Sequence, residues 1–332
     1  MRLREYLHER ALLVNQELER WLPEELKPEV LAKASRHLIK AGGKRLRPCL
    51  TIASCEAVGG KKEDALEAAA AIEMLHNFTL IHDDIMDKDE FRRNVKTVHA
   101  QWGEPIAIIA GDALFSKVFE ALAANASRLK LPAEQTAELF KTISRASFEI
   151  CQGQTLDMLF EGRSDVSEQE YMQMVSAKTG ALMEASARIG VMLGGGTPEQ
   201  VEALAGYGRL MGIAFQIRDD VLGVVGEQEK FGKPVGSDLR EGKCTLMVIH
   251  ALAHASPEDA ALLKRVLKNP EAEENELRAA IEVLKRTGSI EHANEKAQSL
   301  AREAKSKLKP LPESEAKSFL LELADFSVQR EF

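Results

Sequence analysis

Apolar residues recur every three or four positions along most of this chain, which is the spacing of amphipathic α-helices. Ala, Leu, Glu and Lys dominate the composition, and the alternation of Val, Ile and Thr that is typical of strands is scarce. No internal repeat or low-complexity tract divides the 332 residues. We therefore predict an all-α protein that forms a single domain over residues 1–332.

Capping residues mark several of the predicted helix boundaries. Ser167 to Glu170 and Thr197 to Gln200 each have the pattern of a capping box, and each is expected to begin a long helix. The first helix should run to the glycines at 194–196, and the second should run toward Gly226. A further helix is predicted from Glu63 to about Asp87, because this stretch lacks Gly and Pro.

The overall charge and the cysteines restrict the function classes. A formal net charge of -8 argues against nucleic-acid binding, because that role needs a basic surface that displaces counterions from phosphates. The four cysteines lack the close paired spacing of zinc and thioredoxin-type sites, so we expect free thiols in a reducing compartment. No apolar run approaches the roughly 20 residues that span a bilayer. The sequence therefore predicts a cytoplasmic protein without stable membrane insertion.

Two clusters of acids interrupt the helical pattern. Asp83, Asp84 and Asp87 follow one apolar run, and Asp219 and Asp220 follow another. Acids four residues apart on a helix project from the same face, and their like charges repel unless a cation lies between them. Oxygen ligands favour a hard cation, Mg²⁺ before Ca²⁺. For either cluster alone, a solvated acidic helix end is the alternative interpretation.

Three groups of cationic residues accompany these acids. Arg92 and Arg93 closely follow the first acidic cluster, and a Gly/Lys-rich stretch at 232–243 follows the second. Another group lies at 42–48, where two glycines allow the backbone to approach a ligand. Guanidinium groups suit phosphate oxygens because they offer several donors in one plane. Acids and cations together indicate two polyphosphate substrates, with metal on at least one of them.

The motifs occur in an order and spacing that resemble one enzyme family. The chain resembles the trans-prenyltransferases of the short-chain polyprenyl diphosphate synthase family. Its sequence at residues 232–238, GKPVGSD, is most similar to the archaeal geranylgeranyl diphosphate synthase branch. This resemblance implies an all-α isoprenoid synthase fold, in which long helices surround a central active-site cavity. The matching segments are GGKRLRP (42–48), EMLHNFTLIHDDIMD (73–87), RR (92–93), GDAL (111–114), QGQTLD (152–157), KTG (178–180) and QIRDDVLGVVG with GKPVGSDLREGKCTL (216–246).

The resemblance implies a set of residues around an allylic diphosphate. Three Mg²⁺ ions would hold this substrate through Asp83, Asp87 and Asp219, with Asp84 and Asp220 in support. The other side chains expected around the same diphosphate are Arg92, Lys178, Thr179, Gln216, Lys233 and Lys243.

The resemblance also implies a metal-free site for isopentenyl diphosphate, formed by Gly43, Lys44, Arg47, His76 and Arg93. Its allylic partner would be dimethylallyl, geranyl or farnesyl diphosphate, and the enzyme would be a homodimer. The implied reaction ionises the allylic carbon-oxygen bond, lets the isopentenyl double bond attack the resulting cation, and ends with loss of a proton. Fixed positive charge suits this chemistry, because negative charge grows on the leaving diphosphate.

Product length in this family depends on side-chain bulk before the first acidic cluster. By similarity, Phe78 forms the floor of the substrate pocket, with Thr79 beside it and Leu75 a further turn away. One aromatic residue there implies a twenty-carbon product, or a mixture of fifteen- and twenty-carbon products. The chain departs from the common family pattern at Gly223, where many relatives have a third aspartate, and at Asn94, where glycine is usual.

Three other interpretations account for parts of the pattern. A class I terpene cyclase also uses an acidic Mg²⁺ motif, but it has no need for a second diphosphate site such as Lys44, Arg47 and His76. A non-catalytic partner subunit of a synthase often lacks acids that are intact here. A helical scaffold with incidental acids leaves the ordered basic loops unexplained.

Overall fold

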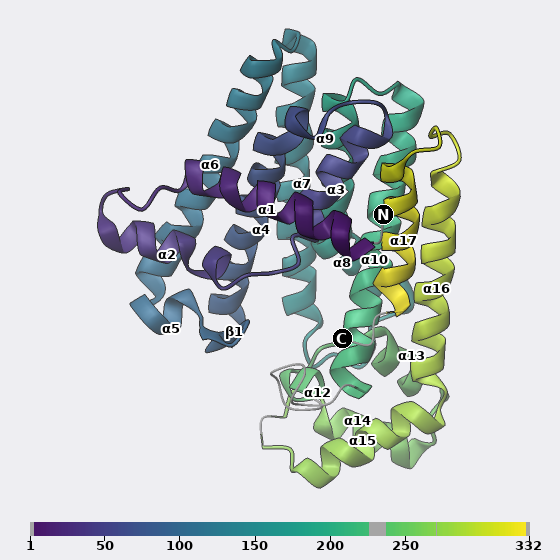
Figure 1. The fold of residues 1–332 in the computed structure, drawn as a ribbon. Helices are drawn as coiled ribbons and strands as arrows, with labels where there is room; N and C mark the ends of the chain where they lie inside the picture. Colours follow the sequence, from purple (N-terminus) through teal and green to yellow (C-terminus); the bar gives the residue numbers. More distant parts are fainter. Residues whose placement is uncertain (1–2, 226–236, 270, 330–332) are drawn as a thin grey trace. The chain divides into compact units, whose positions relative to one another are not determined.

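The computed structural model is almost entirely helical and describes residues 3–225, 237–269 and 271–329 (Figure 1). The prediction of an all-α fold is confirmed, since the strands among these residues form one short two-stranded hairpin. The chain divides into two compact units. Whether they behave as one domain stays a prediction. Unit 1 comprises Met1–Ser147, Leu182–Ala205 and Leu308–Leu321, and unit 2 comprises Phe148–Ala181, Gly206–Lys307 and Glu322–Phe332.

Unit 1 is organised around the packing of α4 (Leu66–Asp87) against α6 (Glu104–Leu129). Both helices contribute several buried alanines, and these small side chains let the two backbones approach closely. Helix α1 lies across α3 and α4 (Figure 1). Further elements with residues in this unit are α1 (Leu3–Trp21), α2 (Glu29–Lys40), α3 (Leu46–Ala57), η1 (Lys62–Ala65), β1 (Phe91–Arg92), β2 (Val95–Lys96), α5 (Val98–Trp102) and α9 (Ala181–Leu193).

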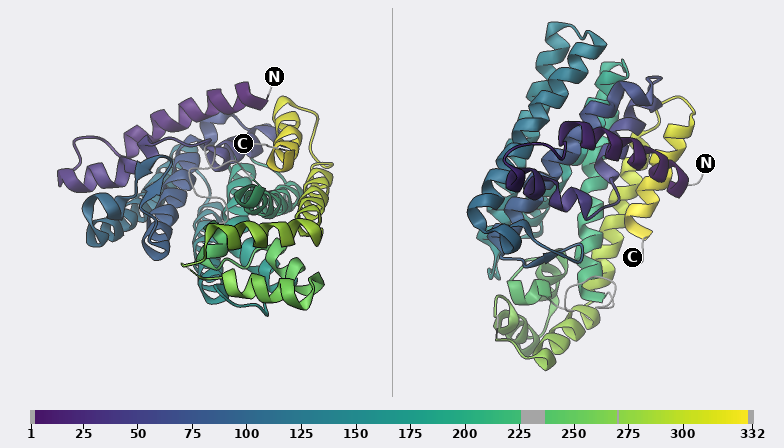
Figure 2. Two further views of the ribbon diagram at one scale, coloured as in Figure 1. Left: turned by 90° about the horizontal axis from the view of Figure 1, so that it is seen from below. Right: turned by 60° about the vertical axis from the view of Figure 1, so that its left-hand side comes forward.

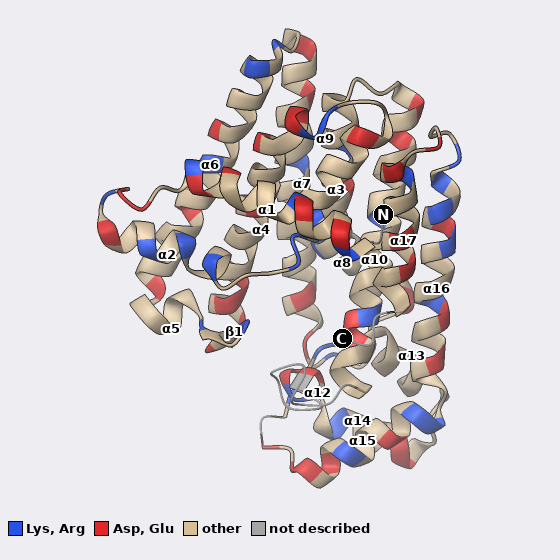
Figure 3. Ribbon diagram, in the orientation of Figure 1, with Lys and Arg blue, Asp and Glu red and all other residues tan. Residues whose placement is uncertain are grey.

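Unit 2 has its own hydrophobic core, which the helices after α10 largely form. Helix α13 packs on α8 and α16, and α14 packs on α15 (Figure 2). Acidic and basic residues alternate along the outer turns of α16 (Figure 3), as expected for a solvated helix face. Elements within this unit are α8 (Glu168–Val175), the π-helix η2 (Ser176–Gly180), α12 (Ser237–Glu241), α13 (Leu246–His254), α14 (Pro257–Val266), α15 (Glu274–Arg286) and α16 (Ser289–Lys307).

Three long helices contribute residues to both units, and several of the predicted boundaries are confirmed. The capping box at Ser167 is present, with reciprocal hydrogen bonds to Glu170, and Thr197 and Gln200 bond to each other in the same way. The helix predicted from Glu63 begins instead at Leu66, after a 3₁₀ turn. These long helices are α7 (Ala133–Phe160), α10 (Pro198–Val225) and α17 (Glu315–Gln329), and α9 shares only its first residue, Ala181, with unit 2.

A stack of three histidine rings connects α13 with α16 inside unit 2. His250 lies between His254 and His292, with ring centroids 4.1 and 4.3 Å away. His250 Nδ1 is also 2.9 Å from Ser289 Oγ. Burial and the two neighbouring rings lower the pKa of His250, because each disfavours a positive charge there. The stack therefore favours a neutral imidazole at His250.

The cysteines and the helix lengths agree with two further expectations. All four cysteines are free thiols, and burial raises the pKa of Cys244 to about 11. None of the helices in the described part of the chain combines the length and the apolar character that crossing a bilayer requires.

Candidate active site

The first acidic cluster occupies the last turn of α4 and is divided by burial. Asp84 is fully buried, whereas Asp83 and Asp87 are half-buried. Because Asp83 and Asp87 are four residues apart, they lie on one face of the helix. The helix ends at Lys88, whose left-handed backbone (φ 57°) caps the last turn. Two accessible carboxylates therefore stand together at the end of α4.

Arg92 holds the buried carboxylate of the cluster. Its Nε donates to Asp84 Oδ1, and its Nη2 lies 3.6 Å from Asp89 Oδ2. Burial raises the pKa of Asp84 to about 6, although the charge of Arg92 opposes this shift. Asp84 Oδ2 is buried and has no hydrogen-bond partner among the described residues. Asp84 thus fixes Arg92 beside the two accessible acids and keeps one oxygen available for a further cation or donor.

The hairpin that carries the two arginines turns at Arg93 and Asn94. Both residues have left-handed backbones, with φ of 54° and 62°. Two consecutive positive φ values between paired strands match the tight turns that follow the twist of a hairpin. Asparagine tolerates this conformation better than most side chains do. This explains how Asn94 can occupy a position where glycine is usual.

Arg93 links this hairpin to the loop between α2 and α3, which we call the glycine-opened loop because it contains Gly42 and Gly43. Its guanidinium donates to the carbonyl oxygen of Leu38 at 2.9 Å and also to that of Gly42. At Gly43, with φ 139°, a Cβ atom would lie 3.1 Å from Arg93 Cζ and 3.2 Å from Arg45 Nη1. A side chain at position 43 would therefore crowd two guanidinium groups, which is a physical reason for glycine in this motif.

The cations of the glycine-opened loop have different environments. Arg47 Nη1 is 3.2 Å from His76 Nε2, so the structure brings these two predicted site residues together. Burial and the charge of Arg47 hold the pKa of His76 well below its usual range, so the ring is neutral. Lys44 is exposed on the loop. Arg45 instead turns inward, where it forms a buried ion pair of 2.8 Å with Glu73.

A row of aromatic rings extends from the predicted floor residue. Phe78 contacts Phe115 at a centroid distance of 5.1 Å, and Phe115 contacts Phe119 at 5.1 Å. Of the other two residues predicted at the pocket floor, Leu75 is fully buried. The Thr79 hydroxyl donates to the carbonyl oxygen of His76 in the same helix. The sequence interpretation missed the rings on α6, although their spacing of four residues indicates a common helix face.

In unit 2, Lys178 lies in the π-helical turn η2 and pairs with Asp157. Its Nζ is 2.6 Å from Asp157 Oδ2. A Cβ atom at Gly153 on α7 would lie 2.2 Å from the backbone N of Lys178. Gly153 therefore lets α7 pack directly against this turn. Single π-helical turns of this kind occur frequently at functional sites.

The second acidic cluster is held by a hydrogen-bonded chain within unit 2. Thr179 Oγ1 donates to Gln216 Oε1 at 3.0 Å, and Gln216 Nε2 donates to Asp220 Oδ1 at 2.9 Å. The Tyr171 hydroxyl donates to Asp220 Oδ2 at 2.7 Å. Burial raises the pKa of Asp220 to about 7. Asp219 and Asp220 are both half-buried. Tyr171 was not among the predicted site residues.

Helix α12 follows the second cluster in the sequence and brings a further acid close to it. A Cβ atom at Gly223 would lie 3.0 Å from Asp238 Oδ2, so this glycine leaves room for the Asp238 carboxylate. Asp238 thus stands beside Gly223, the position where the family resemblance led us to expect a third aspartate. Lys243 Nζ is 3.1 Å from Glu241 Oε2. Lys233 lies outside the described residues.

The donors available for a metal are carboxylate oxygens. Within the described part of the chain, no three His, Cys, Asp or Glu side chains converge to hold a metal ion by themselves. Mg²⁺ suits this arrangement, because it is usually bound through one or two carboxylates, with water and substrate phosphate as the other ligands. The accessible acids and the unpartnered Asp84 Oδ2 therefore fit Mg²⁺ that arrives with a phosphorylated ligand.

Comparison with known proteins gives a consistent result. Residues 28–284 match the family described as Polyprenyl synthetase. The chain is 49% identical to a short chain isoprenyl diphosphate synthase of Methanothermobacter thermautotrophicus, with 92% of each chain covered. It is 41% identical to a geranylfarnesyl diphosphate synthase of Natronomonas pharaonis, with 98% and 96% covered. The crystal structure of geranylgeranyl pyrophosphate synthetase from Pyrococcus horikoshii matches with a TM-score of 0.92 and 45% identity, covering 99% and 98% of the two chains.

Proposed function

This chain belongs to the polyprenyl synthetase family and is a trans-prenyltransferase, and on that premise we propose that it condenses isopentenyl diphosphate with allylic diphosphates. The allylic substrates proposed are dimethylallyl, geranyl and farnesyl diphosphate. The reaction breaks the allylic carbon-oxygen bond, forms a carbon-carbon bond to the isopentenyl unit and releases a proton with diphosphate.

The observation that carries the proposal is that protein donors bind the second acid of each acidic pair. The second acid of each pair is bound by protein groups, since Asp84 accepts from Arg92 and Asp220 accepts from Tyr171. The first acids, Asp83 and Asp219, are half-buried, as is Asp220, whereas Asp84 is fully buried. This pattern supports Asp83 and Asp219 as metal ligands that the protein orients through their neighbours.

We propose Asp83, Asp87 and Asp219 as the ligands of Mg²⁺, with three ions expected when diphosphate is bound. Bound Mg²⁺ would neutralise the negative charge that develops on the leaving diphosphate. The cationic and polar groups would contribute in the same direction, because preorganised donors stabilise that charge more in the transition state than in the ground state. The groups proposed for this role are Arg92, Lys178, Thr179, Gln216, Lys233 and Lys243.

We propose that isopentenyl diphosphate binds at the loop after α2. Lys44 is exposed there, and Arg47 is held by the neutral ring of His76. A neutral His76 can accept from Arg47 through Nε2 and thereby orient the guanidinium. Arg93 and Gly43 complete the proposed site, with Arg93 bound to the backbone of the same loop.

We propose geranylgeranyl diphosphate as the product, alone or with farnesyl diphosphate. Phe78 is backed by Phe115 and then by Phe119, so its ring has little freedom to move aside for a longer chain. Thr79 and Leu75 are the proposed neighbours of that floor. The relatives named above include enzymes named for twenty-carbon and longer products. The homodimeric state and the cytoplasmic location stay part of this proposal.

The function is tested by incubation of the protein with isopentenyl diphosphate and each allylic diphosphate, with and without Mg²⁺, followed by chain-length analysis. We expect elongated products that depend on Mg²⁺. A terpene cyclase would instead consume the allylic diphosphate without isopentenyl diphosphate and release a hydrocarbon. Absence of elongated product from every substrate pair would reject the proposal.

A further inference from the structure

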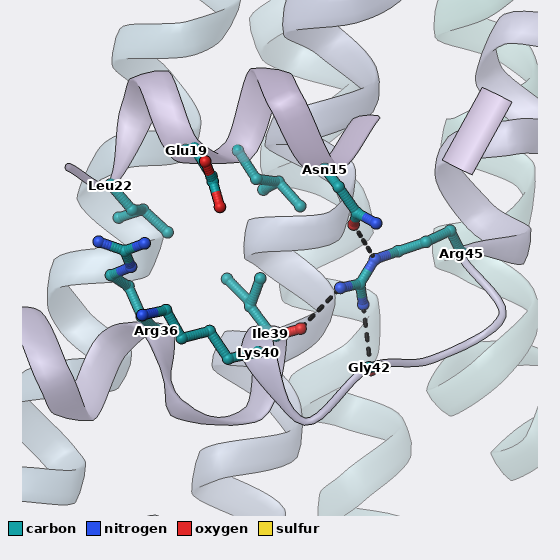
Figure 4. A pocket seen from close by; sticks show the side chains of 9 residues that line it. Asn15, Glu19, Leu22, Arg36, Ile39, Lys40, Gly42 and Arg45 are labelled. Carbon is teal, nitrogen blue, oxygen red and sulfur yellow. Dashed lines mark hydrogen bonds between the residues drawn. The ribbon is translucent and has the colours of Figure 1, made fainter. Parts of the chain in front are cut away.

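A cavity of about 270 Å³ lies in unit 1 between α1, α2 and the loop that follows α2 (Figure 4). None of the roles proposed above uses it. Arg36, Ile39 and Lys40 on α2 face Glu19 on α1 and Leu22 just after it across this space. The complete lining is Asn15, Leu18, Glu19, Leu22, Arg36, Ile39, Lys40, Gly42 and Arg45.

Arg36 is the unusual group in this lining, because it is charged and only 7% exposed. Its Nη1 atom is buried and has no hydrogen-bond partner among the described residues. A buried donor without a partner is costly, and a charged donor is more so. The guanidinium is therefore prepared to bind an acceptor that enters the cavity.

Glu24 lies outside the lining of this cavity, but it shows which chemistry Arg36 and Lys40 accept. Its Oε1 atom lies 2.7 Å from Lys40 Nζ and 3.3 Å from Arg36 Nη2, so two cations converge on one carboxylate oxygen. The side chain of Glu24 is 69% exposed, and these cations lower its pKa. An exposed carboxylate is a weakly held occupant, since surface ion pairs contribute little. A multivalent anion can compete with it.

A second cavity, of about 490 Å³, adjoins the same two cations. Arg36 and Lys40 line it together with Lys27 and Lys33, and Trp102 supplies an aromatic wall. His37 holds that wall through an edge contact of 5.0 Å with the Trp102 ring. Glu19 also lines the first cavity, and Glu24 and Glu29 line the second, so cations outnumber acids in both linings but do not stand alone. Leu18, Leu22 and Ile39 provide apolar surface in the first cavity.

We propose that the first cavity, of about 270 Å³, is an anion site separate from the two proposed substrate sites. It binds a phosphate or diphosphate group through Arg36 and Lys40. The chemistry favours phosphate oxygens, because a guanidinium and an ammonium offer several charged donors to one anion. The cavity is slightly smaller than the range of about 300–1,000 Å³ that holds drug-sized ligands. Its ligand is therefore a free anion or one with a short apolar tail, and a twenty-carbon chain does not fit.

The site also has a structural connection to the glycine-opened loop. Arg45 lines the cavity and donates to the carbonyl oxygens of Ile39 and Gly42 and to Asn15 Oδ1 (Figure 4). Lys44 of that loop and Arg47, at the start of α3, are among the residues proposed for isopentenyl diphosphate. An anion at Arg36 thus binds behind the loop rather than at those side chains.

Isothermal titration with inorganic diphosphate, in chelator and without Mg²⁺, tests the site without any need for turnover. We expect the wild-type protein to bind diphosphate at a site that Arg36→Gln weakens by at least about tenfold, because a charge-assisted hydrogen bond is lost. Arg47→Gln should leave this site intact and affect only the proposed isopentenyl site. Loss of binding at the proposed isopentenyl site should therefore be seen in Arg47→Gln and not in Arg36→Gln, so the two proposals can fail separately.

Three further variants keep the test decisive if Arg36→Gln does not fold. Lys40→Gln changes a side chain that is 56% exposed and should also weaken the site, whereas Glu24→Gln removes the competing carboxylate and should tighten it. Arg20→Gln is the matched control, because Arg20 is 73% exposed and outside both linings. Titration with isopentenyl diphosphate and with inorganic phosphate identifies which source of the anion binds more tightly. Unchanged stoichiometry and affinity in Arg36→Gln and Lys40→Gln would overturn the proposal.

Discussion

Substitution of Gly153 by alanine tests whether close packing of α7 positions Lys178. A Cβ atom at position 153 would lie 2.2 Å from the backbone N and 2.6 Å from the Cα of Lys178. Favourable contacts between heavy atoms begin near 3.5 Å, so the two backbones must separate by about 1 Å. Neither atom is at the end of a flexible side chain, and the displacement therefore moves the π-helical turn itself.

The expected effect on stability is small, and the expected effect on activity is large. Overpacking costs about 1–3 kcal/mol, but alanine in a helix recovers about 1 kcal/mol relative to glycine. The net loss of unfolding free energy is therefore about 0–2 kcal/mol. A displacement of about 1 Å at a positioning group reduces turnover by about a hundredfold. Lys178 also loses its 2.6 Å contact with Asp157 if the turn moves.

Steady-state kinetics with isopentenyl diphosphate and an allylic diphosphate measure this effect, and thermal unfolding measures stability in parallel. Gly206→Ala is the matched control, because Gly206 is also helical and a new Cβ there would lie 3.8 Å from the Lys307 side chain, which is ordinary van der Waals contact. This control should gain up to about 1 kcal/mol of stability and keep its activity. Unchanged kcat/KM in Gly153→Ala would refute the argument that this packing positions Lys178.

Four other substitutions test three separate parts of the structure. Phe78→Ala should shift the products to longer chains, because it removes the ring that Phe115 supports; chain-length analysis showing the wild-type distribution would contradict this. Asp219→Ala should reduce turnover by at least about a hundredfold, whereas Asp220→Ala should reduce it less, and equal effects would count against the assigned ligand ranking. The pKa of His250 is lower in the folded state than in the unfolded chain. Below about pH 6.5 the unfolded chain therefore binds a proton at His250 more readily, so the free energy of unfolding should be highest above that pH and decrease as pH falls. Thermal unfolding of His250→Phe across this range should show a weaker pH dependence than the wild type, and an identical profile would exclude a role of the histidine stack.

Helices and motif positions were predictable because the signals for them are local in the sequence. The spacing of apolar residues indicated the helices, and the side chains at Ser167 and Glu170 indicated a cap that the structure confirms. The pairing of Asp83 with Asp87 on one face follows from the helical repeat alone. The order of the motifs was enough to identify the family.

The burial of particular charges was not predictable, since it depends on residues far away along the chain. The sequence places Arg45 among three similar cations, and only packing shows that it is paired with Glu73 inside the protein. In the same way, Asp84 and Asp83 are adjacent in sequence, but one is buried and the other is accessible. A helix rotates by about 100° per residue, so neighbours in sequence face different surroundings.

The sequence by itself determined the fold class, the family and the residue types of the site. The tertiary structure decided which of those residues meet, such as Arg93 with the backbone of Gly42 and Lys178 with Asp157. It also decided where an unpartnered charge is buried, as at Arg36. The physical reason is that helix periodicity depends on local backbone geometry, whereas desolvation and hydrogen bonding depend on the elements that pack around each side chain.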